Sequence, residues 1–105
     1  MDDRQFEEAA EEIFVRVEDR VDELELDVDI DSGGGVLTFT FEDASQIILS
    51  RQLASHEIWV AARSGGFHLK QSGGADTTWH CATTDEDLDT LINRVFLEQA
   101  GTSLY

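Results

Sequence analysis

The sequence predicts an α+β fold, a two-layer sandwich in which an antiparallel sheet of about six strands carries an N-terminal and a C-terminal helix on one face. Apolar residues recur at helical spacing near both ends of the chain, and between them they alternate with polar residues in short segments. Short strands joined by tight turns pair antiparallel, and two helices that are each apolar on one side must share the apolar face of the sheet. The length of 105 residues suits one domain, so residues 1–105 are expected to fold as a single unit.

The first helix is expected to begin after a cap at Asp2 or Asp3 and to reach Leu24. Its buried side is formed by apolar residues at helical spacing: Phe6, Ala10, Ile13, Phe14, Val17, Val21 and Leu24. The opposite side is acidic, and the basic residues interspersed with it stop at Arg20. Beyond Arg20, like charges lie four residues apart, and each such pair costs about 0.2–0.5 kcal/mol of helix stability.

Strict alternation begins at Glu25. Leu26, Val28 and Ile30 would face the core, and the acidic residues between them would face outward. Further strands are expected over residues 36–41, 46–52, 56–62, 67–70 and 77–81, with turns over residues 32–35, 42–45, 65–66 and 72–74.

A second helix is expected to begin at Thr84, whose hydroxyl can cap it together with Asp87 three residues later. Its buried stripe would consist of Leu88, Leu91, Ile92, Val95 and Phe96. Gly101 would end the helix, since glycine readily takes the left-handed conformation of a C-terminal cap.

The chain is strongly acidic, with 23 acidic and 7 basic residues and a net charge of −16. This charge disfavours nucleic acids, whose phosphates need a basic footprint, and it equally disfavours anionic membrane surfaces. Residues 1–31 alone carry a net charge of −11. The partner that this distribution favours is a metal cation or a basic patch on another protein.

Cysteine usage and the N-terminus predict a cytoplasmic protein. Cys81 is the only cysteine, which excludes an internal disulfide and a thiolate metal cluster and favours a reducing compartment. The acidic N-terminus has neither the apolar segment of a secretory signal nor the basic character of a transit peptide. No apolar run approaches the length that spans a membrane.

No catalytic constellation is evident. His56, His68 and His80 have no cysteine or HExxH-type partners, so they are expected at strand surfaces or in turns. The glycines at 33–35 precede a strand and not a helix, which favours a hairpin turn over a phosphate site. Cys81 is expected to be a small buried hydrophobe.

Carboxylates gather between Glu18 and Asp31, and we call this set the acidic ridge: Glu18, Asp19, Asp22, Glu23, Glu25, Asp27, Asp29 and Asp31. Strand residues two apart lie about 6.5–7 Å from each other, so the three strand aspartates cannot together enclose one small ion. Helical neighbours such as Asp19 and Asp22 approach more closely. Carboxylates accept iron, manganese, magnesium or calcium, and without His or Cys the binding would be weak and exposed. The alternative is a solvated acidic face.

The uncovered face of the sheet is a second candidate site. Trp59 lies out of phase with Ile58 and Val60, so it would point to this face. Arg51 and Gln52 end the preceding strand, and an exposed Trp beside Arg and Gln has the composition of a protein-binding hot spot. The alternative is that Trp59 covers an edge of a thin sheet.

Several segments follow one another in a familiar order and spacing, after an acidic helix and the acidic strand 27–31: Gly34-Gly35-Val36-Leu37-Thr38-Phe39, Ser50-Arg51-Gln52, Ile58-Trp59-Val60-Ala61, Gly65-Gly66-Phe67-His68 and Trp79 before a final helix. Over essentially its whole length the chain resembles the frataxin family, specifically the bacterial CyaY branch. It departs from the family at Ser50, where members usually have Asn, and in lacking the proline common shortly after the Arg-Gln pair.

The resemblance implies a frataxin-like fold and an iron-binding protein of iron–sulfur cluster assembly, either an iron chaperone or a regulator of the cysteine desulfurase. In that family the acidic ridge binds ferrous and ferric iron weakly and exchangeably, and it also meets a basic patch on the desulfurase. Carried over by position, the ridge residues would hold iron, and Arg51, Gln52 and Trp59 would form a second contact area. The cluster scaffold protein is a further expected partner. A monomer without an organic cofactor is expected, and iron could drive it into oligomers.

Two alternatives stay open. Eukaryotic members of the family are credited with ferroxidase activity, but a di-iron oxidase would need Glu-x-x-His pairs inside a bundle, and the sequence has none. The other alternative is an acidic inhibitor that presses on a basic protein without any metal. We expect no enzymatic turnover.

Overall fold

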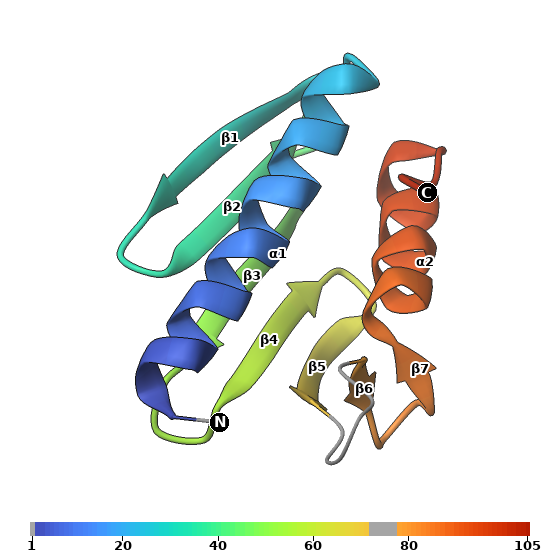
Figure 1. Ribbon diagram of the computed structural model, residues 1–105. Coiled ribbons are helices and arrows are strands. Elements are labelled where there is room, and N and C mark those ends of the chain that lie inside the picture. Colours follow the sequence, from blue (N-terminus) through green and yellow to red (C-terminus); the bar gives the residue numbers. More distant parts are fainter. Residues whose placement is uncertain (1, 72–77) are drawn as a thin grey trace.

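Two helices and seven strands make up the regular structure of this computed structural model, which describes residues 2–71 and 78–105. The elements are α1 (Asp3–Glu23), β1 (Val28–Gly33), β2 (Val36–Phe41), β3 (Gln46–Gln52), β4 (Glu57–Ala62), β5 (Gly65–Gln71), β6 (Trp79–Cys81), β7 (Glu86–Asp87) and α2 (Leu88–Ala100) (Figure 1). The strands form one antiparallel sheet in chain order, so β1 and β7 are its two edges. The predicted α+β sandwich is confirmed, and the strand beyond the expected six is the two-residue β7.

Asp2 caps α1, as the sequence predicts. Its carboxylate accepts a hydrogen bond from the Gln5 backbone N–H at 2.8 Å, and the Gln5 side chain accepts one from the Asp2 backbone N–H at 3.0 Å. The buried side of the helix is the predicted one: Phe6, Ala10, Ile13, Phe14, Val17 and Val21. Leu24 is half-buried and packs against the same core.

The chain leaves α1 through a tight turn at Glu25, which takes a left-handed conformation with φ of 53°. The Glu25 backbone N–H bonds back to the Asp22 carbonyl at 3.0 Å, and the Leu26 N–H bonds to the Val21 carbonyl at 3.4 Å. These bonds continue the helix end and leave Glu25 unavailable for strand pairing. The sheet therefore begins at Val28, three residues after the start of the alternating pattern.

Within residues 2–71 and 78–105, the helices cover one face of the sheet. Apolar residues at every second strand position are buried on it: Leu37, Phe39, Phe41, Ile47, Leu49, Ile58, Val60, Phe67 and Leu69. Both helices pack on this face, α1 toward the β1–β3 side and α2 toward the β5–β7 side (Figure 1). Phe96 of α2 meets Phe39 and Phe41 edge to face, with ring centroids 5.4 and 5.9 Å apart.

The start of α2 differs from the prediction. Asp87, not Thr84, is its cap, and the Asp87 carboxylate accepts a hydrogen bond from the Thr90 N–H at 2.8 Å. The reason is that Glu86 and Asp87 pair with β6 as strand β7, so these residues cannot also form the first helical turn. The end of the helix is as predicted, because Gly101 is left-handed with φ of 78°.

Two further expectations concern the β5–β6 region. The turn at residues 72–74 and the first strand residue, Thr77, lie outside the described residues. The rest of the expected strand is β6.

In the described part of the chain, neither helix is both long and apolar enough to cross a membrane.

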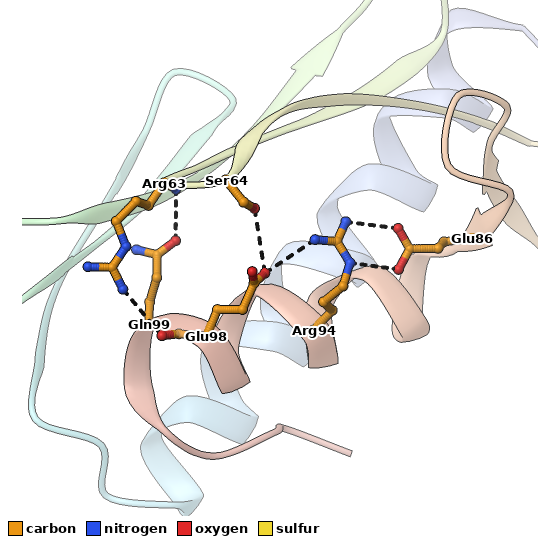
Figure 2. A network of polar contacts seen from close by, with 6 residues as sticks. All are labelled: Arg63, Ser64, Glu86, Arg94, Glu98 and Gln99. Atoms are coloured by element: carbon orange, nitrogen blue, oxygen red, sulfur yellow. Dashed lines mark hydrogen bonds and ion pairs between the residues drawn. The ribbon is translucent and has the colours of Figure 1, made fainter.

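A network of charged and polar side chains fastens α2 to the sheet (Figure 2). Arg94 donates two hydrogen bonds to the Glu86 carboxylate, both at 2.9 Å, and a third to Glu98 at 3.2 Å. The bonds from Arg94 hold the pKa of Glu86 below its ordinary value. One turn later, Gln99 accepts the Arg63 backbone N–H at 2.9 Å, and the Arg63 guanidinium reaches the Glu98 carbonyl. These bonds connect α2 to β7 through Glu86 and to the end of β4 through Arg63.

The segment after α2 returns between the two helices and is fixed there. Leu104 is fully buried. The Asn93 side-chain oxygen accepts hydrogen bonds from the backbone N–H groups of Leu104 and Tyr105, at 3.1 and 2.8 Å. Arg20 of α1 donates to the Leu104 carbonyl. This segment therefore joins α1 to α2 through one apolar and three polar contacts.

We predict that Leu104→Ala lowers the free energy of unfolding by about 2–4 kcal/mol, because it removes a fully buried side chain and leaves a cavity. Leu97→Ala is the matched control. It shortens a leucine that is 56% exposed on α2, and it should change stability by less than about 0.5 kcal/mol. Urea unfolding followed by circular dichroism measures both values. Equal small losses would show that the terminal segment contributes nothing to the fold.

Candidate functional site

The acidic ridge is divided between the helical layer and the open face of the sheet. Asp19, Asp22 and Glu23 are exposed on the last turns of α1. Asp29 and Asp31 are exposed on edge strand β1, and their antiparallel partners on β2 are threonines of the open face. The split follows from strand alternation, because Val28 and Ile30 already occupy the face toward the helices. Glu18 is half-buried, while Glu25 and Asp27 are exposed between the two elements.

The ridge carboxylates are separate ligands and form no closed cage. Among residues 2–71 and 78–105, no three His, Cys, Asp or Glu side chains are grouped so that they could hold a metal ion. In the same residues, the ridge forms an ion pair between the Glu23 carboxylate and the Arg20 guanidinium, 3.2 Å apart. The arrangement can supply hard oxygen ligands one or two at a time, together with a strong negative potential.

A close pair of carboxyl groups lies where β1 and β2 meet the helix ends, and one member was not among the predicted residues. Val28 pairs with Phe41, so Asp27 lies beside Glu42. A hydrogen bond with the Asp27 carboxyl, together with its negative charge, raises the pKa of Glu42. Strand register could have identified Glu42, because the hairpin turn fixes which residues of the two strands meet.

The Asp27–Glu42 pair borders a hollow of about 320 Å³, which Asp43 also lines. Asp43 is already engaged: it accepts the Ser45 backbone N–H at 2.9 Å and pairs with Arg63 at 3.1 Å. Its contacts with Ser45 lower the pKa of Asp43. The uncompensated negative charge of this hollow therefore belongs to Asp27 and Glu42.

Trp59 lies on the open face of the sheet, as predicted, with 36% of its surface exposed. The indole N–H donates to the Glu57 carboxylate at 3.2 Å, and the ring stacks on His68 with centroids 4.2 Å apart and an interplanar angle of 8°. Gln52 pairs with Glu57 across β3 and β4 and so shares this face. Sequence reasoning treated His68 as a surface residue and did not connect it with Trp59.

Arg51 does not lie beside Trp59, and the expected grouping of these two side chains is wrong. Arg51 pairs with the buried Ile58, because neighbouring residues of a strand point to opposite faces. Its side chain lies against Gly35, where an added Cβ would come within 2.6 Å of the Arg51 Nε. With Glu11 and Glu18 of α1, it lines a groove of about 410 Å³ beside the β1–β2 turn.

Arg51 also differs from the other basic residues in its partners. The other six have a carboxylate within 4.0 Å: Arg4, Arg16, Arg20, Arg63, Lys70 and Arg94. Arg51 has no such ion pair within residues 2–71 and 78–105. Arg51 therefore lies in the helix-side groove, on the opposite side of the sheet from Trp59.

His56, His80 and Cys81 lie in the kinds of position that the sequence predicts. His56 lies in the turn before β4, stacks on Phe6 and meets Asp3 at 2.7 Å. His80 meets Asp85 at 2.9 Å. Cys81 is fully buried in the core.

A family model described as a frataxin-like domain matches residues 1–102. The iron–sulfur cluster assembly protein CyaY of Stutzerimonas stutzeri is 50% identical over 88 residues, covering 84% of this chain and 79% of that protein. The protein of the same name from Pseudomonas aeruginosa is 43% identical over 101 residues, covering 96% and 93%. A solved structure of frataxin from Psychromonas ingrahamii superposes with a TM-score of 0.88 at 25% identity, covering 99% and 96% of the two chains.

We predict that Glu42→Gln raises the melting temperature at pH 7, because it removes the repulsion between Glu42 and Asp27. The folded-state pKa of Glu42 lies above its ordinary value, so the stability linked to its proton is present at low pH and is lost as the pH rises through that pKa. The gain should therefore vanish below pH 4.5, the ordinary value, where the carboxyl is neutral in both states.

Glu12→Gln is the control for this prediction, because it removes the same charge from an exposed position on α1. Calorimetric scans between pH 3.5 and about 7.5 would separate the pair from general charge relief. A gain from Glu42→Gln that equals the control at every pH would contradict the coupling.

Proposed function

The chain belongs to the frataxin family, in its bacterial CyaY branch, and we propose that it works in iron–sulfur cluster assembly as an iron-binding protein, either an iron chaperone or a regulator of the cysteine desulfurase. The single observation that carries the proposal is the exposed acidic ridge, which runs from α1 through the turn at Glu25 onto edge strand β1. The names of the relatives support the assembly pathway, since both CyaY proteins compared above are called iron–sulfur cluster assembly proteins.

Iron would be cargo at this surface. Ferrous and ferric ions accept carboxylate oxygens, and exposed carboxylates that form no cage would bind them weakly and release them readily. Such exchange suits a protein that hands iron on. Asp19, Asp22 and Glu23 would form the strongest helical locus, and Asp27 with Glu42 would add a second one.

The partner surface would have two parts. The net charge of −11 on residues 1–31 would attract a basic patch on the desulfurase. Gln52 and Trp59 on the open face would supply a packed contact, and the cluster scaffold protein is a further candidate for the same face. Arg51 would be reached from the β1–β2 turn, so it would meet a different part of a partner from Trp59.

A second candidate function is an acidic inhibitor that binds the desulfurase without metal. It is favoured by the absence of a grouped metal-ligand set within residues 2–71 and 78–105. A chelator distinguishes the two candidate functions. Binding to the desulfurase that depends on salt but is unchanged by a chelator would favour the metal-independent inhibitor. We propose no turnover for either role.

The first prediction from this proposal concerns iron. Replacing Asp19 and Asp22 by Asn and Glu23 by Gln should raise the melting temperature without metal, because repulsion falls. The same variant should lose the rise in melting temperature that ferrous iron causes in the unchanged protein, since a ligand stabilises only the state that binds it. Anaerobic thermal scans and amide shifts during a ferrous titration provide the measurements.

A matched variant with Glu7, Glu11 and Glu12 changed to Gln removes as many charges from the same helix. It should also be more stable without metal, but it should keep the response to iron. If ferrous iron raised the melting temperature of the ridge variant as much as that of the unchanged protein, the assignment of iron to Asp19, Asp22 and Glu23 would be wrong.

The second prediction concerns the desulfurase. Association should weaken steeply from low to moderate salt as the ridge is screened. Reversal of Asp22 and Glu23 to Lys should mainly slow association, whereas Trp59→Ala should mainly speed dissociation, because a desolvated aromatic anchor determines how long a complex lasts. Surface plasmon resonance at several salt concentrations gives both rates. If the affinity for the desulfurase changed neither with salt nor with the charge reversal, the ridge would have no part in this binding and would serve iron binding or solubility alone.

A further inference from the structure

Trp59 is held in the free chain by neighbours on β4 and β5. We infer that His68 is a positioning residue for Trp59: its imidazole, stacked on one face of the indole, fixes the orientation in which Trp59 meets a partner. The inference rests on the proposed partner role of the open face, and it assigns His68 a task that the sequence does not suggest.

Strand pairing brings the two side chains together. Trp59 and His68 lie directly opposite each other in the antiparallel β4–β5 pair. Opposite residues on one face of such a pair have Cβ atoms about 4.5–5.5 Å apart, so their side chains interact. The rings here are nearly parallel, at 8°, with centroids 4.2 Å apart. The backbone therefore delivers the imidazole to the indole face without any loop adjustment.

The edge of the indole has a fixed hydrogen-bond acceptor. Glu57 lies two residues before Trp59 on β4 and accepts the indole N–H at 3.2 Å. Only 13% of the Glu57 side chain is exposed, and Lys70 lies 4.0 Å from its carboxylate. The pKa of Glu57 is lowered chiefly by a hydrogen bond from Ser55, with smaller contributions from Trp59, Lys70 and His68. Glu57 thus stays an ionised acceptor, and the indole is restrained at its edge as well as on one face.

The consequence is a preorganised anchor. A tryptophan on a bare sheet surface would sample several rotamers, and a partner would have to order it on binding, which weakens the complex. With one face on His68 and the N–H on Glu57, Trp59 is ordered before the partner arrives. The other histidines are placed differently, since His56 stacks on Phe6 and His80 meets Asp85.

The first experiment uses the free protein and does not depend on any partner. His68→Ala should shift or broaden the indole N–H resonance of Trp59 and increase quenching by iodide, while the resonance of the buried Trp79 stays in place. His68→Tyr keeps an aromatic ring on the indole and should restore the resonance of Trp59. His80→Ala removes a histidine from β6 and is the control, in which the Trp59 resonance should stay unchanged. An unchanged Trp59 resonance in His68→Ala, or no recovery in His68→Tyr, would overturn the inference.

The second experiment measures affinity for the desulfurase. His68→Ala should weaken binding about fivefold and less than Trp59→Ala, and the double variant should bind no worse than Trp59→Ala alone, because His68 acts through Trp59. A double variant that binds worse than Trp59→Ala would make His68 a direct contact and overturn the positioning role. The positioning role would also be overturned if the His68→Ala variant kept full affinity while the Trp59→Ala variant bound poorly. If Trp59→Ala binds normally, the partner role of this face fails, while the resonances still decide whether His68 positions Trp59.

Discussion

Two helices cover the same face of the sheet, and this one-sided cover determines whether each strand side chain is buried in the core or faces outward. Residues toward the helices form the core, and residues one position along the strand must face solvent or a partner. Trp59 is exposed between two buried neighbours for this reason, and Arg51 lies under α1 although it follows a residue of the open face. The same alternation places Asp29 and Asp31 outside while Val28 and Ile30 reach the core.

Folding concentrates the negative charge of the chain further. Arg63 and Arg94 are engaged with α2 and its neighbouring strands, and Arg16 pairs with Asp89. These pairs engage three of the basic residues away from the stretch from Asp22 to Asp31, whose ion pair within residues 2–71 and 78–105 is the one between Glu23 and Arg20. The electrostatic surface is thus a result of where the few cations are engaged, as well as of how many acids the sequence holds.

Much of the fold follows from the sequence, and the exceptions share a physical cause. The first helix, β2 and β3 were predicted with accurate bounds, because local periodicity, a cap and glycine turns all agree there. The start of α2 was missed, because a pairing with β6 competes with local capping at Thr84. Glu42, His68 and the placement of Arg51 depend on register or on strict alternation, and composition near a site does not contain that information. The ridge residues could be located from the sequence, whereas their separation into two surfaces required the sheet.

The position of β1 has a consequence for self-association. β1 is an edge strand, and no other strand of residues 2–71 and 78–105 pairs with its outer row of backbone N–H and carbonyl groups, which a strand of another molecule could therefore join. Asp29 and Asp31 place negative charges along this edge, so two copies that approach edge to edge bring like charges together. The carboxylates that would attract a cation are therefore also the guard against sheet extension. A cation that neutralised them would weaken this repulsion, so cation binding at the ridge and edge-to-edge pairing of two copies would be linked.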